Sequence, residues 1–533
     1  MDDQGVRAPK MGAARVSGSP NAAAKEEIEL KLLVPAGAIS QLRTAPVVAR
    51  HARSRGVARR LETIYYDTLD HALFTHGLSL RVRRSGSRYM QTIKRAPVHG
   101  QPFARYEWQT PVSSLTPDLA LIPTDEIGGS LETLSTDALH PTFATKIRRR
   151  TQQLELSDAV IEIAFDEGSI EAGEHRESLA EIELELKSGD PRALYDLALG
   201  LLEIAPLRID TQSKSDRGYS LAYSLPGKAS KAKPPLLTAE QTVDDVIGAL
   251  LSTCQHHLLS NQHIAEIGRD PEGVHQMRVA LRRLRTACQL LRRELGSPTA
   301  KVFGAEARWL AQLLGVARDW DVFATETLSK PAAALGSEIL DFDGLRRAAD
   351  PHRLAAYAAL REALANQRYN RFQLSLRCWI ESRGWRNELP SGSLALLLEP
   401  ATEFAGRVLS RLHRKALRRG AHFRHLDAEG RHQLRIALKK LRYATEFFHS
   451  LRDRSDGHYL TCLATLQDAL GHDNDAATTQ PFLYALSLHP VTPEVQRAIG
   501  ALMGWQARDR IAVQTVLRRQ WQQFKAIKPA WQN

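Results

Sequence analysis

The sequence predicts an α+β protein of two domains, an antiparallel β domain followed by an all-α domain. Three observations support this prediction. Apolar and charged residues alternate with a period of two between Glu27 and Lys187. From Leu237 onward, apolar residues recur instead at helical spacing. Between the two regions lies LPGKASKAKPPL (Leu225–Leu236), whose proline, lysine and small residues are typical of a linker.

A chain of 533 residues is too long for one hydrophobic core. We expect a disordered tail over 1–25, the β domain over 26–224, a linker over 225–236 and the helical domain over 237–533. The tail lacks the apolar core of a secretory signal. No apolar run approaches the ~18 residues of a membrane span, and the four cysteines form no CxxC pair. These features favour a cytoplasmic protein without a membrane partner, a disulfide framework or structural zinc.

The net charge of +12 is concentrated in the second half of the chain. Residues 237–533 contain 41 Lys and Arg against 30 Asp and Glu, and 13 of the 19 histidines, whereas the first half is nearly neutral. This asymmetry predicts that the helical half binds a polyanion. Nucleic acid is the usual partner of a basic domain, but we disfavour it because the basic stripes described below lack aromatic residues for stacking.

Each predicted strand of the β half carries its charges on one face. In EIELK, Glu27, Glu29 and Lys31 lie opposite Ile28 and Leu30. The same alternation occurs in LSLRVR with Arg81 and Arg83, TIK with Lys94, ARYEWQ with Arg105 and Glu107, TKIRRR with Arg148, VIEIAFDEG with Asp166, and AEIELELKSG with Glu181, Glu183 and Glu185.

For any single strand, a charged face in water is the simplest interpretation. Across the set, acidic faces lie at both ends of the domain and basic faces lie between them. If these faces point into a closed barrel, its interior is a tunnel lined with cations and carboxylates. Its cations would bind phosphate oxygens, and its paired carboxylates would bind a hard divalent metal, Mg²⁺ or Mn²⁺.

EIELK also resembles the ExExK signature of the CYTH family, the triphosphate tunnel metalloenzymes. LRVR, TIK, RYEW, KIRR, EIELE and SKSDRGY follow in that family's order, so the resemblance extends from Glu26 to Tyr223. It implies an antiparallel eight-stranded β-barrel, the triphosphate tunnel, with flanking helices. The implied activity is metal-dependent hydrolysis of tripolyphosphate to pyrophosphate and phosphate. Adenylate cyclases form a smaller branch of the family, and a non-catalytic polyphosphate-binding protein is a further alternative.

Carried over residue by residue, the resemblance implies three overlapping sets. The metal-binding carboxylates are Glu27, Glu29, Glu181, Glu183 and Glu185. The phosphate-binding cations are Lys31, Arg81, Arg83, Lys94, Arg105, Arg148 and Lys214. The catalytic set is Glu27, Glu29, Lys31, Arg81, Arg83 and Lys94. Glu107 and Asp166 lie on faces that could reach the metal or orient a cation. The tandem Arg148-Arg149-Arg150 leaves open which arginine points inward.

The helical half contains one basic helix twice. HQMRVALRRLR, from His275 to Arg285, recurs 157 residues later as HQLRIALKKLR, from His432 to Arg442. At 100° per residue, each copy forms one positive stripe. The stripes consist of His275, Arg278, Arg282 and Arg285, and of His432, Arg435, Lys439 and Arg442. LLGVARDWD (Leu313–Asp321) recurs as ALGHDND (Ala469–Asp475) at nearly the same offset, which predicts two duplicated helical bundles.

The pattern H-x-x-R-x-x-x-[RK]-x-x-R, occurring twice after a CYTH-like domain, resembles the CHAD family from Leu237 to Trp531. This resemblance implies that the two stripes bind inorganic polyphosphate, with association with polyphosphate granules as a consequence. We expect the stripes to face each other across one groove. The pairs Asp319/Asp321 and Asp473/Asp475 suggest a metal, but we favour helix caps or arginine partners for them.

Overall fold

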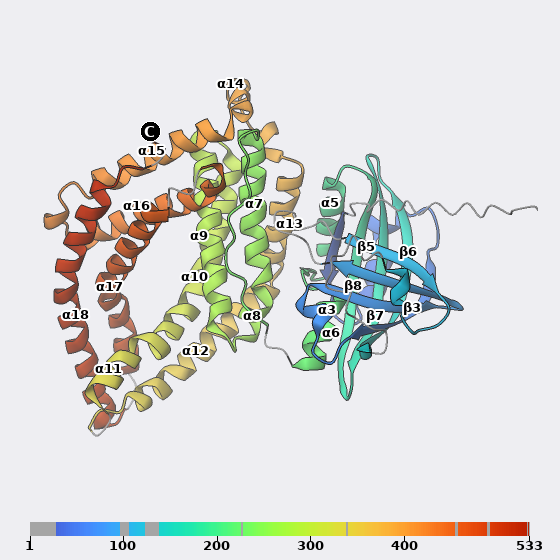
Figure 1. Cartoon of the computed structure of the whole chain (residues 1–533), viewed down its shortest axis with the longest axis horizontal. Coiled ribbons are helices and arrows are strands. Elements are labelled where there is room, and N and C mark those ends of the chain that lie inside the picture. The colour runs from blue at the N-terminus through green and yellow to red at the C-terminus, as the bar shows by residue number, and fades with distance from the viewer. Residues whose placement is uncertain are drawn as a thin grey trace, which may run out of the picture.

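The computed structural model describes residues 28–95, 106–122, 138–224, 227–336, 339–452, 457–487, 491–529 and 531, without the side chains of 106 and 472–478. The expected tail, Glu27 and Arg105 lie outside these residues. The chain forms a β part and a helical part that lie side by side (Figure 1). None of the helices described combines the length and the apolar character needed to span a bilayer.

One sheet forms the β part, and each pair of neighbouring strands is antiparallel. Its spatial order is β5-β4-β3-β2-β6-β7-β8-β1-β9. The strands are β1 (Glu29–Leu33), β2 (Val57–Asp67), β3 (Leu78–Ser85), β4 (Arg88–Arg95), β5 (Tyr106–Val112), β6 (His140–Glu155), β7 (Ala159–Ala172), β8 (His175–Gly189) and β9 (Arg208–Ile209). Gly86 and Gly173, with φ of 63° and 55°, allow the tight turns β3–β4 and β7–β8.

The sheet differs from the closed eight-stranded barrel that we expected. Among the described residues, β5 and β9 are its two edges, and no pairing joins them. The short β9 pairs with Leu32 and Leu33 of β1, on the edge that closure onto β5 would need. Alternation along a strand predicts which residues share a face, but it does not predict which edges meet.

Helices cover the apolar face of β1, β7 and β8. They are α1 (Ala38–Arg43), α2 (Pro46–Ala49) and α5 (Arg192–Leu202). Leu32, Ile163 and Leu184 of the sheet are fully buried with Leu194 of α5. Because neighbouring residues of a strand point to opposite faces, this packing turns the charged residues of β1 and β8 toward the other face, which we call the inner face.

Helix α6 (Lys214–Tyr223) lies on the inner face. A Cβ at Gly218 would lie 2.0 Å from the Phe143 ring, so glycine lets the helix rest directly on β6. Ser213 caps the helix by accepting from the Asp216 N–H, and the Asp216 carboxylate accepts from the Ser213 N–H at 2.8 Å. This capping box fixes Lys214, the first residue of the helix, against the sheet.

The second part of the chain is largely helical. Its helices are α7 (Val243–Ser260), α8 (Gln262–Ile267), α9 (Pro271–Glu294), α10 (Pro298–Val322), α11 (Ser329–Leu335), α12 (Phe342–Ala365), α13 (Gln367–Glu381), α14 (Ser391–Leu394), α15 (Ala401–Arg419), α16 (Ala428–Phe447), α17 (Gly457–Ser487) and α18 (Pro493–Ala526). The two histidine-led copies lie on α9 and α16, and the second repeated element lies on α10 and α17. Both copies bury their apolar sides, including Leu281 and Leu438, in one continuous core.

The two parts of the chain also contact each other directly, through α5 and α13 (Figure 1). Leu374 of α13 is fully buried in the core that covers the sheet. Gln367 donates a hydrogen bond to the Leu202 carbonyl at 3.1 Å, and Arg208 forms an ion pair with Glu266 at 2.9 Å. Their relative position therefore does not depend on the joining segment alone.

Candidate functional site

The strand register gathers charged side chains on the inner face. Lys31 lies opposite Glu183, and Asp166 lies between Arg149 and Glu181 on the neighbouring strands. Residues directly opposite each other in antiparallel strands share a face. Asp166 and Glu181 are only 0% and 1% exposed. The inner face is therefore an enclosed charged interior, although its strand pairing is open.

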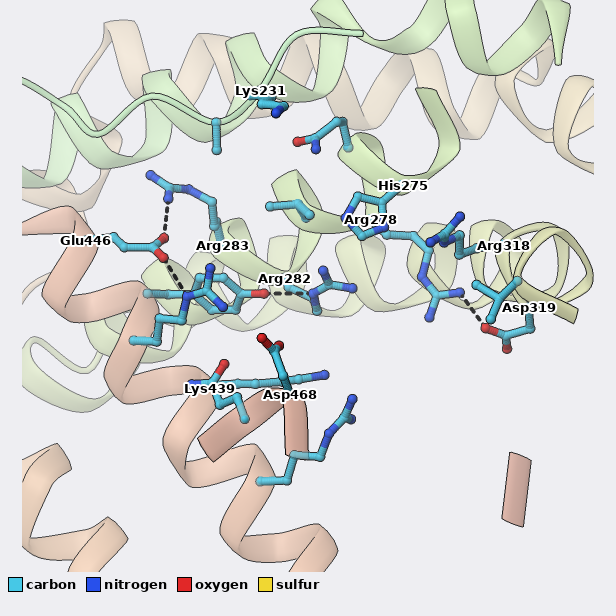
Figure 2. A pocket seen from close by; sticks show the side chains of 18 of the residues that line it. Lys231, His275, Arg278, Arg282, Arg283, Arg318, Asp319, Lys439, Glu446 and Asp468 are labelled. Atoms are coloured by element: carbon cyan, nitrogen blue, oxygen red, sulfur yellow. Dashed lines mark hydrogen bonds and ion pairs between the residues drawn. The ribbon is translucent and has the colours of Figure 1, made fainter. Parts of the chain in front are cut away.

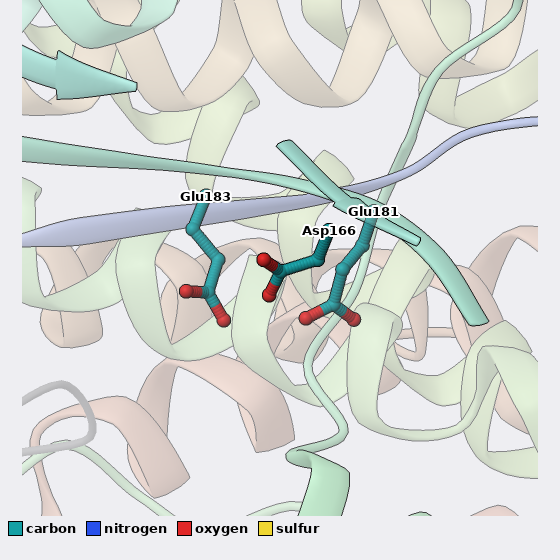
Figure 3. A group of neighbouring side chains, drawn as sticks. All are labelled: Asp166, Glu181 and Glu183. Carbon is teal, nitrogen blue, oxygen red and sulfur yellow. The ribbon is translucent and has the colours of Figure 1, made fainter. Parts of the chain in front are cut away.

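Three carboxylates converge in this interior: Asp166 of β7 with Glu181 and Glu183 of β8 (Figure 3). One oxygen from each lies within 4.8 Å of the others. The Lys214 ammonium lies 3.0 Å from Asp166 and 2.7 Å from Glu183, and it also contacts Glu181. Arg149 donates two hydrogen bonds to Asp166, at 2.8 and 2.6 Å, and contacts Glu183. These cations offset the cost of burying the carboxylates.

The carboxylates of this cluster differ in acidity. Burial raises the pKa of Glu181. Burial acts in the same direction on Glu183, but Lys214, Arg149 and Lys31 outweigh it and hold the pKa of Glu183 well below its usual value. Burial would lower the pKa of Lys214, yet Glu183, Asp166 and Glu181 together raise it. Lys214 therefore stays charged, and the cluster binds its ammonium group as a cation.

The same residues fit a hard divalent metal. Carboxylate oxygens are the ligands that Mg²⁺ and Mn²⁺ prefer. Although the Lys214 ammonium is in contact with Glu181, neither oxygen of this buried carboxylate has a hydrogen-bond partner of good geometry among the residues that the structure describes. Glu181 thus has lone pairs available for a metal ion. Lys214 and a metal would compete for these oxygens.

A second group of inner-face residues carries excess positive charge. Arg81 lies 3.5 Å from Glu107 and donates to the Tyr65 hydroxyl at 3.4 Å, and Lys94 also forms an ion pair with Glu107. Arg83 donates to the neutral Thr63 hydroxyl at 3.3 Å. Repulsion by Arg81, together with burial, lowers the pKa of Arg83 to about 10. One carboxylate does not balance these cations, so an anion would stabilise them.

Some of the site residues predicted for the β part lie inside the charged interior, and others lie outside it. Lys31, Arg81, Arg83, Lys94, Glu181, Glu183 and Lys214 lie in the enclosed interior. Glu29 is exposed opposite Glu185, and Glu185 forms an ion pair with Lys187 at 2.5 Å, so neither joins the carboxylate cluster. Glu27 and Arg105 lie outside the described residues.

Arg148 requires a correction. It is exposed on the opposite face of β6, and Arg149 takes the place expected for it. The alternation rule misleads here because β6 turns its apolar residues inward. Phe143 and Ile147 pack in the interior against α6, and Arg149 continues their face. Asp166 was noted from its strand pattern, whereas no sequence signal marked Tyr65.

In the helical part, the two basic stripes meet in a pocket of about 830 Å³ between α9, α10, α16 and α17 (Figure 2). Six of the eight predicted residues line it: His275, Arg278, Arg282, Arg435, Lys439 and Arg442. Arg285 and His432 are not among the lining residues. Arg318 of α10 and Lys231 of the joining segment add cations that the predicted set omitted.

The second repeated element positions the first arginine of each stripe. Arg278 donates to the Gly315 carbonyl at 2.8 Å and to Asp319 at 3.0 Å. In the second copy, a Cβ at Gly471 would lie 3.4 Å from the Arg435 guanidinium. The glycine thus packs against the arginine in both copies, which explains why the two sequence elements are duplicated together.

We expected the aspartate pairs of this element to be helix caps or arginine partners. Asp319 is an arginine partner, as described, and Asp321 accepts from Arg353 at 2.6 Å and from Tyr357 at 2.7 Å. The side chains of Asp473 and Asp475 lie outside the described part of the chain.

Among the residues whose side chains the structure describes, the pocket has more lining cations than carboxylates. Burial, together with Arg435 and Arg282, lowers the pKa of Lys439 to about 7. Burial and Arg318 lower the pKa of His275. Among the described residues, no carboxylate forms an ion pair with Lys439. An anion in this pocket would relieve the repulsion.

Comparisons with known proteins divide the chain in the same way. Residues 25–219 match the family model of the CYTH domain, and residues 249–484 match that of the CHAD domain. An inorganic triphosphatase of Haemophilus influenzae is 33% identical over 165 residues, which are 30% of this chain and 46% of that protein. An uncharacterised protein of Mycobacterium tuberculosis is 25% identical over 346 residues, covering 61% of this chain and 64% of that protein.

The matched regions therefore span less than two thirds of either relative. Among solved structures, the CHAD domain from the plant Ricinus communis is 30% identical with a TM-score of 0.49. That match covers 57% of this chain and 98% of the plant domain.

Proposed function

Because the chain carries a CYTH domain followed by a CHAD domain, we propose that it is a metal-dependent inorganic triphosphatase with a polyphosphate-binding module. The observation that supports the activity best is the enclosed inner face of the sheet. There, Arg81, Arg83 and Lys94 lie beside a buried cluster of three carboxylates. Phosphoryl transfer needs cations and a bound metal around the transferred group, and this interior places cations next to a carboxylate site that could hold the metal.

The cations of the interior have two tasks in this proposal. Arg81, Arg83 and Lys94 bind the oxygens of the triphosphate, whose charge adds to that of Glu107, the carboxylate that Arg81 and Lys94 share. Arg149, which contacts Asp166 and Glu183, favours ionised Glu183, so the cluster retains negative charge when Mg²⁺ or Mn²⁺ takes the place of the Lys214 ammonium. Asp166, Glu181 and Glu183 would hold the metal, which would supply charge neutralisation at the phosphates and activation of water. Burial of Asp166 and Glu181 strengthens their interactions with cations relative to the same interactions in water.

The pocket of the helical domain is proposed to bind inorganic polyphosphate. A linear polyanion suits it because cations reach it from two duplicated helices, with His275, Arg278 and Arg282 on one side and Arg435 and Lys439 on the other. Each phosphate can accept from a guanidinium fork or an ammonium group.

Phosphate release from a substrate panel tests the proposal. We expect hydrolysis of tripolyphosphate with Mg²⁺ or Mn²⁺, and none after chelation with EDTA. ATP, thiamine triphosphate and long-chain polyphosphate complete the panel. Production of cyclic AMP from ATP would favour the cyclase alternative, and inactivity toward the whole panel would favour a non-catalytic binding protein. Titration of long-chain polyphosphate into the full chain tests the proposed polyphosphate binding of the helical domain separately.

A further inference from the structure

The segment that joins the two domains is fixed to the helical domain at two points. At the first, the Ser230 N–H donates to Asn261 Oδ1 at 2.8 Å, and Asn261 Nδ2 donates to the Ser230 carbonyl at 3.0 Å. His257 Nε2 lies 3.0 Å from the same carbonyl. Asn261 and His257 are buried, at 0% and 4% exposure. Without Ser230, these polar groups would lose hydrogen bonds that burial makes costly to leave unmade.

The second anchor lies a few residues farther along. Ser450 donates to the Pro235 carbonyl at 3.2 Å and accepts from the Leu237 N–H at 2.7 Å. Arg283 also approaches the Lys233 carbonyl at 3.4 Å. The residues between the anchors are therefore held along the surface of the helical domain rather than free in solvent.

This held stretch forms one wall of the cationic pocket. Lys231, Ala232 and Pro234 are among its lining residues. Lys231 lies at one edge of the space and Lys439 at the other (Figure 2). The Lys231 side chain is exposed and, in the part of the chain that the structure describes, forms no ion pair. Lys228, which precedes the first anchor, is also exposed but does not line the pocket.

We propose that Lys231 is a polyanion-binding residue and that the joining segment is an integral wall of the polyphosphate site. A phosphate chain held by the cations of α9 and α16 would contact Lys231 as it leaves the pocket along this wall. The bound polymer would then hold the joining segment more firmly against the helical domain. This inference rests on the proposed binding of polyphosphate by the helical domain.

Two single substitutions in the full chain, Lys231→Ala and Lys228→Ala, test the proposal. Each removes one lysine from the same segment, so their effects on net charge and on long-range attraction are matched. Under the proposal, only Lys231→Ala removes a contact with the bound polyphosphate. We expect it to weaken binding of long-chain polyphosphate by about two- to fivefold. It should also reduce the slope of log affinity against log salt by roughly 0.7, the value for a single-stranded polyanion. Lys231→Arg should retain the slope.

The possible outcomes separate this inference from the proposed function. If the unaltered chain does not bind polyphosphate, the proposed function of the helical domain fails. If it binds and the two alanine variants have the same affinity and the same salt slope, the domain binds the polymer without Lys231, and the inference is wrong. A larger effect of Lys228→Ala than of Lys231→Ala would also overturn it.

Discussion

Lys439 should make polyanion binding depend on pH near neutrality. Its pKa is lowered to about 7 by burial and by Arg435, Arg282, Arg278 and Arg442. The amine is therefore charged below pH 7 and largely neutral above it. A bound polyanion favours the charged form, so binding above pH 7 requires uptake of a proton. Affinity should consequently fall as pH rises.

The magnitude follows from the charged fraction of Lys439 in the free protein. With a pKa of about 7, this fraction is about 0.9 at pH 6 and about 0.09 at pH 8. If the bound polymer keeps the amine charged throughout, affinity falls about tenfold over this interval. The lowered pKa of His275 moves its charging to more acidic pH, so His275 contributes toward the acidic end of this interval. This differs from a simple histidine effect centred on pH ~6.5.

Lys439→Arg isolates the effect, because arginine keeps the charge at both pH values. Titrations of long-chain polyphosphate from pH 6 to 8 at constant ionic strength should show a nearly flat profile for this variant. At pH 8 the variant should bind more tightly than the unaltered chain. Lys440→Arg is the control, since Lys440 does not line the pocket and should keep the pH dependence. Equal pH profiles for Lys439→Arg and the unaltered protein would refute the reasoning.

Three further predictions concern the β part and its contact with the helices. Arg149→Ala should lower kcat/KM for tripolyphosphate on the order of 10²–10³-fold. Arg148→Ala, on the exposed face, should change kcat/KM little. The reverse result would reject our assignment of Arg149 as the inward arginine. Lys214→Met should tighten Mn²⁺ binding measured calorimetrically without substrate, because the competing ammonium is gone; unchanged affinity would argue against competition. Leu374→Ala should destabilise the full chain by about 2–5 kcal/mol in denaturant unfolding. Leu354 is 62% exposed, so Leu354→Ala should have little effect on the free energy of unfolding. Equal effects of the two variants would contradict the packing of α13 on the sheet domain.

Some features of this protein follow from short-range patterns in the sequence. Alternation in EIELK identified Lys31 as a residue opposite the apolar face, because neighbouring strand residues always point to opposite sides. The repeat of the helix led by His275 predicted a duplicated helical domain, because equal sequences adopt the same helical face. Six of the eight stripe residues line one pocket, since the helices that carry them pack against each other.

Other features depend on contacts between distant segments, which no local pattern contains. Arg149 faces inward because β6 turns Phe143 and Ile147 toward α6, a choice made by packing rather than by alternation. Asp166 joins Glu181 and Glu183 through the register of two strands.

Composition alone described the joining segment as a linker. Its fixed path along the pocket depends on hydrogen bonds between Ser230 and Asn261 and between Pro235 and Ser450. The sequence by itself determined which faces are charged and which elements repeat. The tertiary structure decided which charges meet, because that depends on register, packing and burial across the whole chain.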